Sequence, residues 1–235
     1  MVRGLAMTFD ARSRLFLFLC GIFVAALVVG DLIGCKLVEV TVLGSPFVLS
    51  MGIIPFPLTF LLTDVLNEFY GKQAARLVTW VGFAAAVFTT AVVALVLQLP
   101  YAPFTLAPDW GGATPDAFGR VFGSGLNILV ASCVAYVLAQ FIDIGVFILL
   151  KKQTHGRFLW LRATGSTLVS QLIDTIVIQS LAWSGSLELG RLLSLVLASY
   201  LVKLTVAIAL TPAIYAVHAL VEKVLKIPPM PPQET

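Results

Sequence analysis

Charged residues are scarce in this chain: only 11% of its 235 residues are Asp, Glu, Lys or Arg, whereas a soluble domain carries about 25%. Hydrophobic residues make up 59% of the chain, and its mean hydropathy is +1.00. A globular core of this length cannot bury so much apolar side chain, which excludes a soluble domain. We therefore predict a polytopic integral membrane protein of the all-α class.

Cysteine and histidine are also scarce, with three and two residues. Cys20 and Cys133 fall within apolar runs and Cys35 has no obvious partner, so no disulfide framework is expected. His155 and His218 have no further ligand at metal-binding spacing, and we expect neither a metal nor a cofactor. The chain also lacks an H-E-x-x-H motif, a serine elbow with a histidine partner and a nucleotide-binding loop, which argues against an enzyme.

Six apolar stretches are long enough to cross a bilayer, which takes about 20 residues at about 1.5 Å each. They run over Leu15–Gly30, Leu49–Tyr70, Leu77–Leu99, Val121–Leu150, Ala163–Trp183 and Leu192–Leu220. The first is short unless it continues toward Leu37. It follows a basic start, as in a signal peptide, but "LVVGDLIGCK" offers no small-x-small cleavage site, so we interpret it as a retained helix. The predicted organisation is an N-terminal segment over 1–14, a six-helix transmembrane domain over 15–222 and a disordered, proline-rich tail over 223–235.

The placement of Lys and Arg predicts the orientation of these spans. One side of the membrane would hold eleven of them: Arg3, Arg12, Arg14, Lys72, Arg76, Lys151, Lys152, Arg157, Arg162, Lys223 and Lys226. The other side would hold three: Lys36, Arg120 and Arg191. The positive-inside rule then predicts that both termini are cytoplasmic. The net charge of +3 reflects this loop topology and does not predict nucleic-acid binding.

The segment between the first two spans alternates apolar and polar residues on either side of "GSP", from Val38 to Leu49. Alternation around a turn favours a short β-hairpin that would lie over the entrance, although an amphipathic loop fits equally well. Next, Pro55 and Pro57 predict either a helix that begins near Pro55 or a second span that is broken or kinked. Transporters place substrate at such interruptions. Three spans followed by three would also allow an inverted repeat, with the second and fifth spans in matching positions.

Four carboxylates lie within or at the edge of the spans, where each costs about 2.5–3.5 kcal/mol. Because these carboxylates cost free energy in the membrane, a functional role explains their presence better than a stabilising one. Residues three or four apart share a helix face, which gives stripes of Phe60, Asp64, Asn67 and Glu68, of Tyr136, Gln140 and Asp143, and of Ser170, Gln171, Asp174 and Ile178. Lys203 is the basic residue at the depth of the midplane. Two structural alternatives stay open: Glu68 could reach the interface beside Lys72, and Asp174 could simply pair with Lys203.

Two segments carry a specific resemblance to a known family: "IIPFPLTFLLTDVLNEFYGKQAAR" and "GRFLWLRATGSTLVSQLIDTIVIQSLAW". Their pattern of proline, then T-D-x-x-x-E-x-Y-G-x-x-x-A-R, then S-Q-x-x-D-T, resembles the queuosine precursor transporter family, formerly named a vitamin uptake family. The resemblance covers nearly the whole chain. It implies a six-helix importer of 7-cyano- and 7-aminomethyl-7-deazaguanine in the bacterial inner membrane, serving queuosine salvage. It also implies a distant likeness to the substrate-binding subunits of energy-coupling-factor transporters.

The implied ligand suits the polar stripes. A 7-deazaguanine offers two adjacent donors, N1–H and the 2-amino group, to a carboxylate such as Asp174, and its 6-oxo group accepts from an amide. The expected binding residues are therefore Phe60, Asp64, Asn67, Glu68, Gln140, Asp143, Gln171, Asp174 and Lys203. Asp143 or Asp174 could carry a proton for coupled import, and facilitated diffusion fits as well. A binding subunit energised by a separate ATPase, a carrier of another nucleobase or vitamin, an intramembrane enzyme and a homo-oligomer all remain open.

Overall fold

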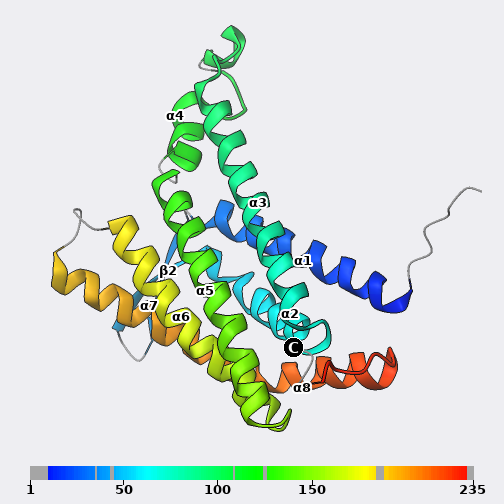
Figure 1. Cartoon of the computed structure of the whole chain (residues 1–235). Coiled ribbons are helices and arrows are strands. Elements are labelled where there is room, and N and C mark those ends of the chain that lie inside the picture. The colour runs from blue at the N-terminus through cyan, green and yellow to red at the C-terminus, as the bar shows by residue number, and fades with distance from the viewer. Residues whose placement is uncertain are drawn as a thin grey trace, which may run out of the picture.

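The structure, a computed structural model, describes residues 10–34, 36–42, 45–107, 109–123, 126–183 and 188–231 (Figure 1). Its longer elements are α1 (Ala11–Ile33), β1 (Leu37–Val42), β2 (Ser45–Ser50), α2 (Phe56–Phe69), α3 (Gly71–Gln98), α5 (Leu126–Gln153), α6 (Leu159–Trp183), α7 (Leu189–Ala209) and α8 (Thr211–Ala219). The short ones are η1 (Met51–Ile53), η2 (Pro103–Leu106), α4 (Pro115–Phe118), η3 (Gly119–Gly123) and η4 (Leu220–Val224). The described chain is thus nearly all helical, as its composition predicts.

Four helical stretches of the described residues are long and apolar enough to cross a membrane: Ala11–Ile33, Gly71–Gln98, Val130–Gln153 and Leu192–Val224. The exposed face of α3 is apolar, because Leu77, Trp80, Phe88 and Leu95 are all exposed there. Apolar side chains on an outer surface suit a lipid environment. α6 has 25 residues, a length of about 37 Å at 1.5 Å per residue, but its polar face makes it less apolar than these four.

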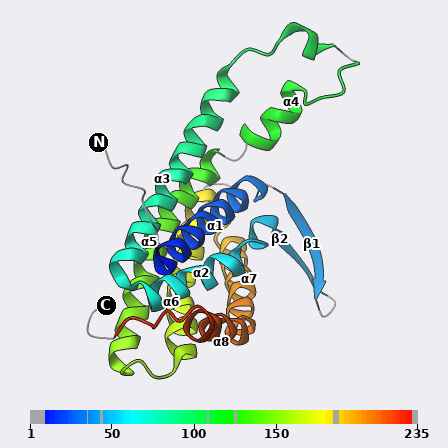
Figure 2. The ribbon, with the colours of Figure 1, turned by 90° about the vertical axis from the view of Figure 1, so that its right-hand side faces the viewer.

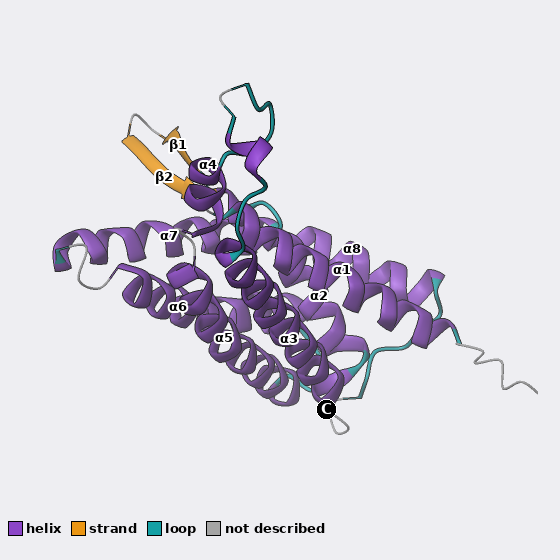
Figure 3. Cartoon of the chain, turned by 90° about the horizontal axis from the view of Figure 1, so that it is seen from above, coloured by secondary structure: helices purple, strands orange, loops and turns teal. Residues whose placement is uncertain are grey.

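The bundle is built around α2. α3 runs beside α5, α5 beside α6, and α6 beside α7 (Figure 1). α2 contacts α1, α3, α5, α7 and α8, and most of its side chains from Phe60 to Phe69 are buried. Figure 3, seen from above, shows the helices gathered together with the strand pair to one side.

β1 and β2 form an antiparallel pair in the segment where the sequence favours a hairpin. Their register runs from Leu37 opposite Ser50 to Val42 opposite Ser45. Residues 43–44, where the predicted turn begins, lie outside the described residues. Figure 2 shows the pair projecting from the bundle near the end of α1.

Several helix boundaries differ from those that hydropathy predicts. α2 begins at Phe56 with Pro57 in its first turn, where a proline removes no helical hydrogen bond. With 14 residues it is about 21 Å long, short of the roughly 30 Å hydrocarbon core. The predicted sixth span is divided into α7 and α8 at Leu210, because Pro212 cannot continue the hydrogen bonding of α7. The predicted fourth span, Val121–Leu150, corresponds to the end of η3 and to α5, while residues 124–125 between them lie outside the described residues.

Gly82 lets three helices approach closely. A Cβ atom at this position would lie 2.6 Å from the Tyr136 hydroxyl of α5 and 3.1 Å from the Phe23 ring of α1. The Tyr136 hydroxyl in turn donates to the Thr79 carbonyl at 3.2 Å. Glycine at position 82 therefore leaves the space that the Tyr136 hydroxyl occupies beside α3.

The proline-rich tail is ordered as far as Pro231, contrary to the predicted disorder. Ile227 is buried in an apolar cluster that includes Leu19 and Phe69. The Met230 N–H donates to the Glu68 carbonyl at 2.9 Å. These contacts hold the tail against the end of α2, while residues 232–235 lie outside the described residues.

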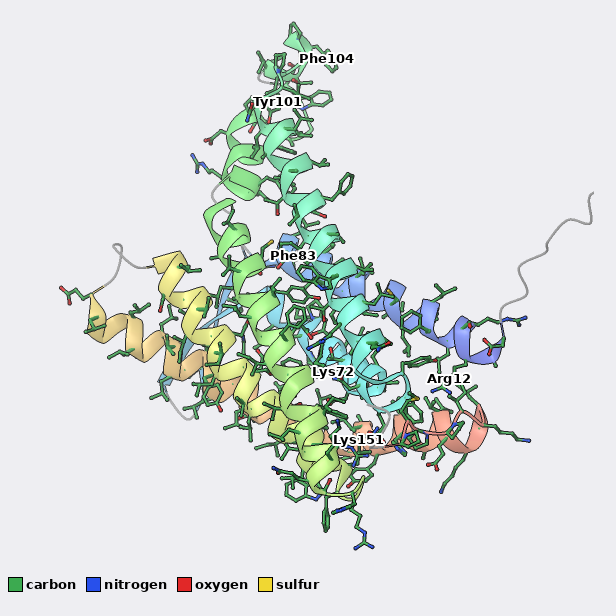
Figure 4. All side chains as sticks on the ribbon, in the orientation of Figure 1. Arg12, Lys72, Phe83, Tyr101, Phe104 and Lys151 are labelled. Carbon is green, nitrogen blue, oxygen red and sulfur yellow. The ribbon has the colours of Figure 1, made fainter. Side chains whose placement is uncertain are left out.

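A buried ion cluster joins α2 to α5 and α6. Arg162 donates to both oxygens of the Glu68 carboxylate, through Nε at 3.0 Å and Nη2 at 2.8 Å. Lys151, labelled in Figure 4 near the lower end of the bundle, lies 3.2 Å from the same carboxylate. Its Nζ also donates to the Glu68 carbonyl at 3.1 Å. All three side chains are at most 4% exposed, so one carboxylate balances two buried cations.

Further contacts anchor this cluster. Arg162 Nη1 donates to the carbonyls of Gly156 and Arg157, which closes the turn between α5 and α6. His218 Nε2 of α8 lies 3.6 Å from the Glu68 carboxylate. Glu68 is therefore paired inside the bundle with Lys151 and Arg162, rather than at the interface beside Lys72.

Replacement of Glu68 by Gln should destabilise the bundle strongly. It leaves two buried cations without a counter-charge, and removing one partner of a buried ion pair costs about 3–5 kcal/mol. We expect a clearly lower melting temperature in detergent. Asp116→Asn is the matched control, because it removes a carboxylate from the Asp116–Arg120 pair, whose side chains are more than 70% exposed. Equal melting temperatures for the two variants would contradict a structural role for Glu68.

Candidate functional site

A cavity of about 380 Å³ lies between α1, α2, α5, α6 and α7, within the range of small-molecule sites. It occupies the end of the bundle near the strands, where Gly30, Ile53 and Phe122 contribute to its wall. Helix α2 connects this cavity to the Glu68 cluster. Phe60 lines the cavity, and Glu68 follows two turns later on the same helix.

Besides Thr59 and Thr63 of α2, polar side chains of four other helices line this cavity. They are Asp31 of α1, Ser132, Tyr136, Gln140 and Asp143 of α5, Ser170, Gln171, Asp174, Thr175 and Gln179 of α6, and Ser199 and Lys203 of α7. The three- and four-residue spacing on α5 and α6 places each set on one helix face, as the sequence predicts. Phe56, Thr59, Phe60 and Thr63 of α2 complete the wall.

Asp174 and Lys203 form an ion pair within the cavity wall. Lys203 Nζ lies 2.6 Å from a carboxylate oxygen of Asp174 and donates to the Gln171 amide oxygen at 3.1 Å. The same ammonium stands 4.8 Å from the centre of the Phe56 ring. The internal pairing that the sequence left open for Asp174 is therefore present. Because Lys203 bonds only the amide oxygen, the amide nitrogen of Gln171 remains a hydrogen-bond donor.

Phe56 and Phe60 supply an aromatic surface beside this pair. Their ring centres are 4.0 Å apart in an edge-to-face arrangement. Both rings line the cavity. An aromatic face of this kind can stack with a flat heterocycle.

Asp143 of α5 also lines the cavity and is 7% exposed. The Ser170 hydroxyl donates to its carboxylate at 3.1 Å, which joins α5 to α6. Gln140 lines the cavity one turn earlier on α5. Carboxylate and amide groups therefore face the space from two sides.

Three of the expected binding residues do not line the cavity in this conformation. Asp64 is buried, with 3% of its surface exposed. Asn67 is completely buried, and neither its amide oxygen nor its amide nitrogen has a hydrogen-bond partner among the described residues. Glu68 belongs to the ion cluster. Together they lead from the cavity toward the far end of the bundle.

The structure also adds residues that the polar stripes do not reveal. Asp31 accepts a hydrogen bond from the Ser132 hydroxyl at 3.1 Å. The Thr175 hydroxyl is fully buried and has no hydrogen-bond partner in the described part of the chain. Hydropathy misses Asp31 because the first predicted stretch ends at Gly30. The threonine of the S-Q-x-x-D-T pattern is the signal that could have indicated Thr175.

Comparisons with known proteins agree with this architecture. The family described as "Putative vitamin uptake transporter" matches residues 50–217, which include α2, α5 and α6. A protein named "Probable queuosine precursor transporter" from Bacillus subtilis (strain 168) is 30% identical over 173 residues, which cover 73% of this chain and 72% of that protein. The "Queuosine precursor transporter" of Escherichia coli (strain K12) is 29% identical over 137 residues, 58% of this chain and 55% of that protein.

No solved structure matches the chain significantly. The family match covers most of the sequence and includes both segments whose motifs carry the resemblance. These matches, together with the apolar helices around a polar cavity, show that the chain belongs to the queuosine precursor transporter family, whose members have also been described as vitamin uptake transporters.

Proposed function

We propose that this chain imports 7-cyano- and 7-aminomethyl-7-deazaguanine across the bacterial inner membrane for queuosine salvage. The observation that carries the proposal is the polar cavity among apolar helices, in a chain whose relatives are named as queuosine precursor transporters. Charged and amide groups inside a membrane domain are energetically costly, so their presence around a cavity favours a role in binding a substrate or an ion.

The hydrogen-bonding groups of the cavity suit the edge of the base. Lys203 occupies one oxygen of the Asp174 carboxylate, so that the other can accept from the N1–H and 2-amino donors of the base. The amide nitrogen of Gln171 can donate to the 6-oxo group. Stacking on the rings of Phe56 and Phe60 adds about 1–3 kcal/mol, by analogy with base stacking on aromatic side chains. Gln140 and Asp143 of α5 offer further partners in the cavity wall.

Asp64, Asn67 and Glu68 act after binding in this proposal. They follow the cavity along α2 toward the Glu68 cluster, which closes that end of the bundle. The Asn67 amide, which has no hydrogen-bond partner in the described part of the chain, is available to a substrate that passes it. Release on that side requires the cluster to separate.

The proposed topology has six crossings, with the shorter α2 as the second and the polar α6 as the fifth. Both termini are cytoplasmic, and the two helices occupy matching positions in two inverted halves of three. The cavity then opens toward the outside, and the β1–β2 pair lies over its entrance as a lid. The support is the distribution of Lys and Arg, with Arg12 at the start of α1, Lys72 at the start of α3 and Lys151 near the end of α5.

Reporter fusions test this orientation. A reporter that is active only in the cytoplasm should be active when fused after Thr235. The same reporter inserted at Gly111, in the segment between α3 and α5, should be inactive. Activity of the Gly111 insertion together with an inactive Thr235 fusion would reverse the orientation.

Uptake by the purified chain in liposomes tests the function. Vesicles that contain this chain alone should accumulate labelled 7-aminomethyl- or 7-cyano-7-deazaguanine faster than empty vesicles, and unlabelled guanine should compete less well. Uptake that appears only after an ATPase module is added would support the alternative of a binding subunit. Comparison with and without a pH gradient separates proton-coupled import from facilitated diffusion.

The same assay separates binding from passage. Asn67→Ala should retain most of the binding measured in detergent, because Asn67 does not line the cavity, but should slow uptake. Loss of binding and uptake in equal proportion would instead make Asn67 a direct ligand of the bound base.

Asp174→Asn tests the recognition of the base. The amide turns one acceptor into a donor that faces a ligand donor, a mismatch worth about 1–3 kcal/mol or roughly ten- to a hundredfold in affinity. Asp109→Asn, an exposed change in the outer segment, is the control and should bind normally. If Asp174 only neutralises Lys203, the double variant Asp174→Asn with Lys203→Met should recover binding, which would end the ligand-contact assignment.

A further inference from the structure

Asp31 places a carboxylate in the cavity from the end of α1. Its partner is the Ser132 hydroxyl, 3.1 Å away on α5 and 101 positions later in the chain. Asp31 and Asp174 both line this cavity. The two carboxylates therefore belong to one site, although only Asp174 has a cation beside it among the described residues.

The described cavity wall carries more negative than positive charge. Its ionisable side chains include three carboxylates, Asp31, Asp143 and Asp174, and one ammonium, Lys203. Lys203 compensates Asp174, whereas Asp31 and Asp143 receive hydroxyl hydrogen bonds from Ser132 and Ser170. An unpaired carboxylate away from water is costly, and a cationic ligand offsets that cost.

Thr175 is an independent sign of a ligand at this place. The residue lines the cavity, and its hydroxyl is fully buried and has no hydrogen-bond partner among the described residues. Thr175 and Asp31 line the same cavity, from α6 and α1. A buried polar group of this kind normally has a partner in the functional state.

The chemistry of these three side chains points to a primary ammonium. Such a group has three N–H donors and no acceptor. The Asp31 carboxylate and the hydroxyl oxygens of Ser132 and Thr175 offer three acceptors, one of them charged. A nitrile offers only a lone pair and no donor, so it leaves the carboxylate without a counter-charge.

We propose that Asp31, Ser132 and Thr175 form a cation subsite that holds the ammonium group of the substrate and selects the aminomethyl base over the cyano base. This proposal rests on the proposed function, since it assigns the 7-substituent to one part of the same cavity. Asp174 and Gln171 bind the other edge of the base. Selection between the two precursors then depends on Asp31, and recognition of the shared ring depends on α6.

The experiment compares the affinities of the purified chain for the two bases in detergent. The wild-type protein should bind 7-aminomethyl-7-deazaguanine more tightly than 7-cyano-7-deazaguanine. Asp31→Asn should lower the ratio of the two affinities by roughly ten- to a hundredfold, because a hydrogen bond to a charged group is lost for one ligand alone. Asp109→Asn, which removes an exposed carboxylate outside the cavity, should leave the ratio unchanged.

Two milder variants guard against a misfolded Asp31 variant. Thr175→Val and Ser132→Ala should each lower the same ratio severalfold. A ratio that stays constant in all three variants, or a parallel loss for both bases, would overturn the subsite while leaving the proposed function intact. Failure of the wild-type protein to bind either base would overturn both.

An inorganic cation is the competing occupant, and the same titrations detect it. They are repeated with sodium replaced by choline. If binding of the cyano base requires sodium in the wild-type protein but not in Asp31→Asn, the subsite holds a metal cation and the ammonium assignment is wrong. Affinities that do not depend on sodium support the ammonium.

Discussion

The Glu68 carboxylate pairs with two buried cations, Lys151 and Arg162, at the end of α2. α2 is too short to span a bilayer by itself, so its end must be satisfied inside the protein. The Glu68 carbonyl accepts from Lys151 and from the Met230 amide, and the Phe69 carbonyl accepts from Arg12. These contacts fix the position of α2, and α2 in turn carries the aromatic wall of the cavity.

The two ends of the bundle consequently differ in charge. In the described cluster, cations outnumber the single carboxylate, whereas in the described cavity wall carboxylates outnumber the single ammonium. In the proposed import, a neutral or cationic base is favoured in the cavity and meets excess positive charge at the other end. The Glu68 cluster would then be both a mechanical and an electrostatic barrier. Passage of the proposed substrate would require Glu68, Lys151 and Arg162 to rearrange.

Hydropathy and helical spacing predict most of the helices and the polar faces of α5 and α6, because both depend on local sequence. They do not reveal the break at Leu210, because Thr211 and Pro212 lie inside a continuous apolar run. The predicted disordered tail includes Ile227, whose burial depends on contacts with residues far away in sequence. The roles of Glu68 and Asp31 escape prediction for the same reason: their partners, Arg162 and Ser132, are 94 and 101 positions away.

The pairing of Asp174 with Lys203 makes Asp174 electrostatically different from Asp31, the carboxylate on α1. A carboxylate whose charge is already balanced can accept from the donors of a neutral ring without a large desolvation penalty, since its counter-ion stays in place. Asp31 has only a hydroxyl as its described partner and gains most from a ligand that brings its own positive charge. In the proposed function, recognition of the ring would fall to the charge-balanced Asp174 and recognition of its substituent to Asp31. One cavity would then accept a common ring while discriminating between its substituents.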